Sequence, residues 1–181
     1  MKLETPAWRP NAKQYRRRWA SIAAVVIIAP LVMATANRPP AFDQRILLAH
    51  NRERLDLGLE PLRWNAALAQ AARRWANHLA LTGQFEHAPE NPGAPEGENL
   101  WAGRSVFPEA MVAAWIREKR FFRPGLFPDN STIRGMEVGH YTQVVWRATK
   151  EVGCAQATGV REDFLVCRYA EAGNYRGERP F

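Results

Sequence analysis

Histidine is the side chain best suited to proton transfer and metal binding near neutral pH, and this chain has four of them. His50 and His78 lie inside segments with helical periodicity, where a lone histidine is usually a packing residue. His87 and His140 lie outside the predicted helix interiors. We therefore take His87 and His140 as the candidates for chemistry and the other two as structural residues.

The chain has only two cysteines, Cys154 and Cys167. Apolar segments at 152–157 and 164–169 flank a stretch, 158–163, with the turn chemistry of a β-hairpin. In such a hairpin the two cysteines would lie opposite each other, at a distance that a disulfide can span. We predict a Cys154–Cys167 disulfide that adds stability; the alternative is two buried free thiols.

Three helices are expected to position these residues. The first runs from Phe42 to about Leu57, and Gly58 can end it. Asn65 is a plausible N-cap for the second, which Gly83 closes. The apolar stripe of the second helix repeats at helical spacing and consists of Leu68, Ala71, Ala72, Trp75, Ala76 and Leu79. A third helix is predicted to begin near Pro108 and to bury Val112, Trp115 and Ile116.

The chain thus changes from helical patterns to strand patterns in its last third, after a loop at 123–130 that is rich in proline and glycine. Helices followed by a short antiparallel sheet indicate an α+β domain. We assign this domain to residues 42–181, after a stiff spacer at 37–41 that contains two prolines.

The first 36 residues have the pattern of an export signal. Residues 1–18 carry six basic side chains and one acidic side chain, residues 19–36 carry no charge, and Ala34-Thr35-Ala36 provides a cleavage site. The alternative is a signal anchor in which residues 19–36 stay in the membrane, although Pro30 interrupts that segment. Both interpretations predict a secreted or periplasmic domain, with no membrane contact except through an uncleaved N-terminal segment.

This signal accounts for most of the positive charge. Removing six of the 25 basic and one of the 18 acidic residues leaves 19 and 17, a net charge of +2 for the remaining chain. The charge therefore gives no support to nucleic-acid binding, which needs a basic face on the folded domain.

Three short segments resemble the signatures of the CAP superfamily, the cysteine-rich secretory, antigen 5 and pathogenesis-related 1 proteins that share the SCP domain. The most specific is the octet Gly139-His140-Tyr141-Thr142-Gln143-Val144-Val145-Trp146. Gly97-Glu98-Asn99-Leu100-Trp101 precedes it, and Cys167-Arg168-Tyr169 with Gly173-Asn174 follows it. The resemblance implies a three-layer α-β-α sandwich with a small antiparallel sheet between helices.

The resemblance also implies a cleft in which two histidines and two glutamates converge. Matched one residue at a time, this tetrad consists of His87, Glu98, Glu118 and His140. Asn99, Gln143 and Tyr169 would support and orient the four side chains. In the third signature Arg168 and Glu171 replace the family's usual asparagine and proline, which puts ligand contacts through that loop in doubt.

Such a tetrad allows three functions. His87 and His140 could bind Zn²⁺ as a labile site, with a glutamate as third ligand or as the acceptor that orients a ring. A metal-assisted hydrolase or endopeptidase could use Glu98 and Glu118 as its catalytic groups. The third is a structural scaffold with an inert cleft. We favour a binding module for a divalent metal and an extracellular lipid, sterol or cell-wall component, and commit to no catalytic residue.

Other residues carry weaker signals. A serine protease is disfavoured because the nearest serine after Glu98 is Ser105, and Arg104 occupies the position where some family members have serine. The motif Asn130-Ser131-Thr132 fits a glycosylation acceptor but is a common chance match. Tryptophans at helical spacing are more often core residues than parts of a lipid or sugar groove; they are Trp64, Trp75, Trp101, Trp115 and Trp146.

Overall fold

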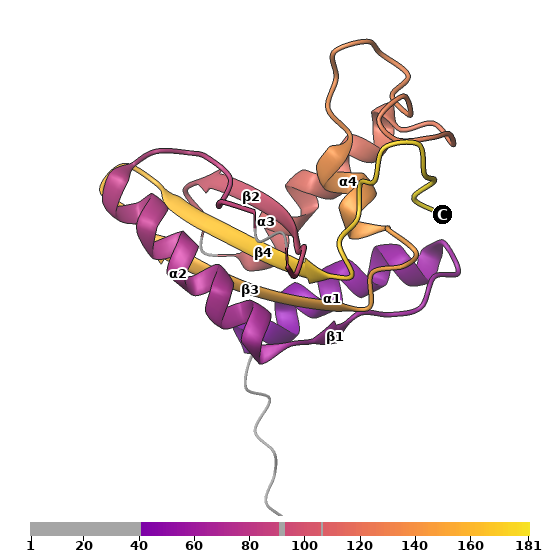
Figure 1. The fold of residues 1–181 in the computed structure, drawn as a ribbon. Helices are drawn as coiled ribbons and strands as arrows, with labels where there is room; N and C mark the ends of the chain where they lie inside the picture. Colours follow the sequence, from indigo (N-terminus) through magenta and orange to yellow (C-terminus); the bar gives the residue numbers. More distant parts are fainter. Residues whose placement is uncertain (1–40, 91–92, 106) are drawn as a thin grey trace, which may run out of the picture. The chain divides into compact units, whose positions relative to one another are not determined.

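The computed structural model describes residues 41–90, 93–105 and 107–181 (Figure 1). The predicted export signal, including the possible anchor at 19–36, and the spacer up to residue 40 lie outside these residues. Within the part described, none of the helices combines the length and the apolar character needed to cross a membrane.

The first two helices begin and end where local signals predict. α1 spans Phe42–Asp56 and α2 spans Ala66–Thr82. The side-chain oxygen of Asn65 accepts hydrogen bonds from the first turn of α2, at 2.8 and 3.1 Å. Gly83 ends α2 in the left-handed conformation, with φ of 68°, and its N–H donates to the carbonyl of Leu79.

Four strands form one sheet in the order β1-β3-β4-β2. Their bounds are β1 Arg63–Trp64, β2 Gly97–Gly103, β3 Glu151–Thr158 and β4 Asp163–Ala170. The predicted hairpin is β3–β4, with Cys154 opposite Cys167 and the two joined by a disulfide. β2 pairs with β4 in antiparallel fashion. β1 is the exception to the antiparallel sheet: it pairs parallel to β3 through two residues before Asn65 caps α2.

Helices cover both faces of this sheet, so the predicted three-layer α-β-α sandwich is confirmed (Figure 1). α2 packs on one face, where Phe164 and Val166 of β4 point toward it. α1, α3 (Pro108–Ile116) and α4 (Gly139–Val144) lie on the other face, which receives Leu165 and Cys167. This alternation along β4 separates the core into two clusters, one on each side of the sheet.

Close packing of α2 depends on a glycine in β3. A Cβ atom at Gly153 would overlap backbone atoms of Asn65 and Ala69 at the start of α2. The backbones of the helix and the strand therefore meet without a side chain between them, which fixes the position of the first turn of α2 over the sheet.

Two elements that carry site residues differ from the expectation. The third helix, α3, ends at Ile116, and Glu118 lies in a 3₁₀ helix, η1 (Arg117–Phe121), that continues it. The first six residues of the octet form α4, a short helix that buries Tyr141 and Val144 at helical spacing and is followed by the buried C-cap residue Val145. His140 therefore lies in the first turn of a helix and close to η1.

Candidate functional site

His87 and Glu98 form the first of two histidine–glutamate pairs. His87 lies in the loop after α2, and Glu98 is the second residue of β2. The Nδ1 atom of His87 is 2.7 Å from Oε1 of Glu98, which also accepts the backbone N–H of Ala88 at 3.0 Å. A carboxylate only accepts hydrogen bonds, so Nδ1 of His87 carries the proton. This hydrogen bond raises the pKa of His87. Among the described residues, none forms a hydrogen bond with its Nε2 atom.

His140 and Glu118 form the second pair. Nδ1 of His140 is 2.6 Å from Oε1 of Glu118, and the backbone N–H of Tyr141 donates to Oε2 at 3.1 Å. The imidazole stacks on the ring of Trp115, with centroids 6.3 Å apart and an interplanar angle of 12°. The indole N–H of Trp115 donates to the carbonyl of Leu100 at 2.9 Å. The orientation of His140 is thus fixed by a carboxylate and by a buried ring that is itself fixed.

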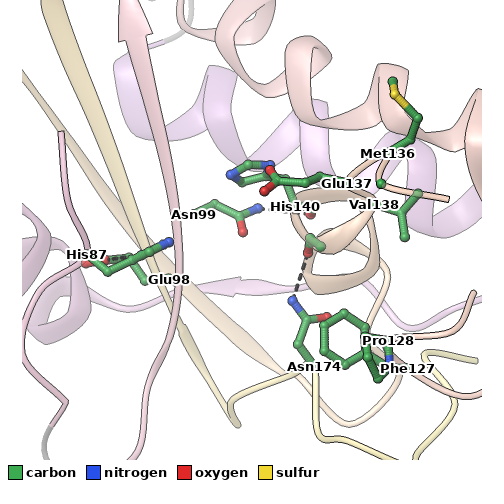
Figure 2. A pocket seen from close by; sticks show the side chains of 12 residues that line it. His87, Glu98, Asn99, Phe127, Pro128, Met136, Glu137, Val138, His140 and Asn174 are labelled. Carbon is green, nitrogen blue, oxygen red and sulfur yellow. Dashed lines mark hydrogen bonds and ion pairs between the residues drawn. The ribbon is translucent and has the colours of Figure 1, made fainter. Parts of the chain in front are cut away.

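Both histidines line one cavity of about 410 Å³. Figure 2 shows His87 and Glu98 on one side of it and His140 and Glu137 on the other, with Asn99 between. Glu118 does not line the cavity; it accepts the hydrogen bond from Nδ1 of His140. The remaining wall is largely apolar and includes Phe127, Pro128, Met136 and Val138. The cavity therefore combines a polar floor with an apolar side.

The donor set fits a divalent cation held by two imidazoles. Each histidine uses Nδ1 for its glutamate, which leaves the two Nε2 atoms as the candidate ligands, as in metal sites where a carboxylate orients the ring. Within the described residues, no three His, Cys, Asp or Glu side chains are gathered closely enough to hold an ion. Both expected ligands, His87 and His140, line the same cavity, and the metal site itself stays a prediction.

A buried hydrogen-bond chain supports His140 from below. Asn99 donates from Nδ2 to the carbonyl of His140 at 3.0 Å and to the hydroxyl of Tyr169 at 3.3 Å. That hydroxyl lies 2.8 Å from Nε2 of His50, whose Nδ1 donates to the carbonyl of Ile46 at 2.8 Å. Burial lowers the pKa of His50 to about 4, so its ring is neutral. Asn99 positions His140 directly and Tyr169 acts through Asn99.

Gln143 supports the site as a scaffold residue, without contacting the tetrad side chains. Its Oε1 accepts the backbone N–H of Gly173 at 3.0 Å, and its Nε2 donates to Thr149 at 3.2 Å. It therefore holds the segment after β4 against α4 and makes no hydrogen bond to the tetrad side chains. His78, expected to be structural, stacks on Trp75 with centroids 4.4 Å apart.

Arg168 is a site residue whose role the sequence did not reveal. It lies opposite Glu98 across β2 and β4, with its Nε 3.0 Å from Oε2 of Glu98 and an Nη atom 3.4 Å from Glu96. The 3.0 Å contact is an ion pair without an aligned hydrogen bond. Arg168 also lines a second cavity, of about 620 Å³, that shares His87 and Glu98 with the first. Only the register between β2 and β4 could have indicated this pairing.

The weaker sequence signals do not lead to the cavity. The part of the chain that the structure describes contributes no serine, cysteine or tryptophan to the wall of the 410 Å³ cavity. Ser105 instead bonds to the backbone of Phe107. Asn130 is fully buried, so the glycosylation motif is not accessible in this fold.

Known proteins resemble this chain over most of its length. The family model of CAP, the cysteine-rich secretory protein family, matches residues 47–169. Pathogenesis-related protein PR-1 of Medicago truncatula is 37% identical over 145 residues, covering 78% of this chain and 80% of the relative. Pathogenesis-related protein 1A of Nicotiana tabacum is 37% identical over 154 residues, covering 83% of this chain and 88% of the relative. Among solved structures, that of NaASP2 with Zn²⁺ superimposes with a TM-score of 0.67 at 22% identity, covering 78% of this chain and 86% of the other.

Proposed function

Because this chain belongs to the CAP family of cysteine-rich secretory proteins, we propose that it acts outside the cytoplasm as a binding module for a divalent metal and an amphiphilic ligand. His87 and His140 hold the metal through Nε2. The observation that carries this proposal is the pairing of both Nδ1 atoms with glutamates, at 2.7 and 2.6 Å, on the wall of one cavity. Paired in this way, each imidazole offers its remaining nitrogen in a fixed orientation.

Zn²⁺ is the metal that we propose, since it accepts nitrogen ligands in a flexible geometry. When bound, it would supply a positive charge and an open coordination position inside the cavity. The family is one of secreted proteins, and the basic, uncharged and A-x-A segments of residues 1–36 support export of this chain as well.

Titration calorimetry of the full chain with Zn²⁺ tests the metal site. We expect binding by the native protein and none measurable by the double variant His87→Ala/His140→Ala. The matched control is His78→Ala, which removes a third imidazole that lies on α2 and does not line the cavity, and it should bind as the native protein does. Equal binding by the native protein and the double variant would reject the metal site.

The apolar side of the cavity favours a lipid or sterol over a cell-wall saccharide. Met136 and Phe127 could contact a hydrocarbon chain or ring system, while Asn99 and the histidines face its polar end. Met136→Glu should therefore abolish the binding of a fluorescent fatty acid or sterol, because it places a charge on the apolar wall. Ile133→Glu is the control, since Ile133 is 50% exposed against 40% for Met136 and does not line the cavity. Unchanged binding by Met136→Glu would argue against this ligand class.

A further inference from the structure

The two glutamates of the tetrad already have partners for all four of their oxygen atoms. Oε1 of Glu98 accepts from His87 and Ala88, and Oε2 is paired with Arg168. The oxygens of Glu118 accept from His140 and from the backbone of Tyr141. If either carboxylate turned to bind a cation, it would abandon the hydrogen bond that fixes its histidine. Their role in a metal site is therefore to orient the imidazoles.

Glu137 is a carboxylate in a different situation. It lines the 410 Å³ cavity together with His87 and His140, and its side chain is exposed. Within the described part of the chain it has no hydrogen bond or ion pair that would have to be broken. In Figure 2 Glu137 extends into the cavity from the same side as His140.

We propose that Glu137 provides the third protein ligand of the divalent cation that His87 and His140 bind. This inference rests on the proposed metal-binding function. Two imidazole nitrogens and one carboxylate oxygen with an open fourth position form a donor set typical of zinc sites that keep a water molecule. Since no three such side chains are already gathered around one point in the described residues, Glu137 must rotate toward the histidines when the cation enters. An exposed, unpaired side chain can make this movement at little cost.

The test is titration of the full chain with Zn²⁺, together with the visible absorption of bound Co²⁺, which reports on ligand number and geometry. We expect Glu137→Gln to weaken Zn²⁺ binding by at least about tenfold, the lower end of what the loss of even an outer partner costs a metal site. Its Co²⁺ spectrum should also change. Glu137→His should instead tighten binding, because it completes a site of three histidines.

The matched control is Glu86→Gln, which removes the same charge from an exposed residue next to His87 that lines neither cavity. Screening at ordinary salt should limit its effect to roughly twofold. The inference would be overturned if Glu137→Gln bound Zn²⁺ as tightly as Glu86→Gln does and its Co²⁺ spectrum were unchanged. If that result came with loss of binding in His87→Ala/His140→Ala, the two-histidine site would stand and only the role of Glu137 would fall. Zn²⁺ binding that survives in His87→Ala/His140→Ala would reject both the two-histidine site and the role of Glu137.

Discussion

The histidines of this protein differ because their Nδ1 atoms meet different partners. In His87 and His140 the partner is a carboxylate next to a cavity, so the ring is held with Nε2 available. In His50 both ring nitrogens are used inside the core, by the carbonyl of Ile46 and the hydroxyl of Tyr169. The same side chain thus serves as a candidate ligand in two places and as a buried neutral connector in a third.

His50 makes the stability of the fold depend on pH. Burial lowers its pKa from an ordinary value of 6.5 to about 4, so between these values the unfolded chain binds a proton that the folded chain does not. The free energy of unfolding should therefore fall as the pH drops from 6.5 toward 4, by roughly 3 kcal/mol in total from this group. Urea unfolding near pH 7 and near pH 4.5, with metal removed by a chelator, measures the loss.

His50→Gln is the variant that isolates this contribution. It should be less stable than the native protein near pH 7, but its stability should fall less on acidification because the titrating group is gone. His87 acts in the opposite direction: its raised pKa contributes stability at low pH that is lost as the pH rises through the folded pKa. An identical pH dependence in the native protein and in His50→Gln would contradict the assignment.

At the scale of elements, the sequence predicted what local signals determine. Asn65 and Gly83 mark the ends of α2 because each satisfies backbone groups within one turn of the helix. The β3–β4 hairpin was predictable because its turn separates two apolar segments along the chain. β2 was not predicted: it is paired with a strand some 60 residues later, and its small and polar residues lack the alternation of an isolated strand.

The site was predictable to a similar extent. His87 and His140 could be separated from the other histidines because both were predicted to lie outside helix interiors, although His140 lies in the first turn of α4. The resemblance to a family added Glu98 and Glu118. The pairing of Arg168 with Glu98 and the place of Glu137 on the cavity wall depend on contacts between distant segments. No periodicity or spacing in the sequence reports such contacts, so these two residues needed the structure.

At the scale of the whole domain, the β3–β4 hairpin is the element that both helical layers share. Leu165, Cys167 and Cys154 face the layer of α1, α3 and α4, while Phe164 and Val166 face α2. Loosening the hairpin therefore exposes both core clusters at once. We expect the two layers to unfold in a single cooperative transition, as small single domains usually do.

The Cys154–Cys167 disulfide should raise the temperature of that transition. Its cysteines are 13 positions apart, and closing a loop of this size is worth about 3 kcal/mol in the chain-entropy model. The double variant Cys154→Ala/Cys167→Ala should therefore unfold about 10 °C below the native protein. Tryptophan fluorescence and far-ultraviolet circular dichroism should report the same lower midpoint, because both layers depend on the hairpin. An unchanged unfolding midpoint in the double variant would show that the bridge does not stabilise the domain in solution. Two free thiols, counted in the unsubstituted protein after denaturation, would show the same.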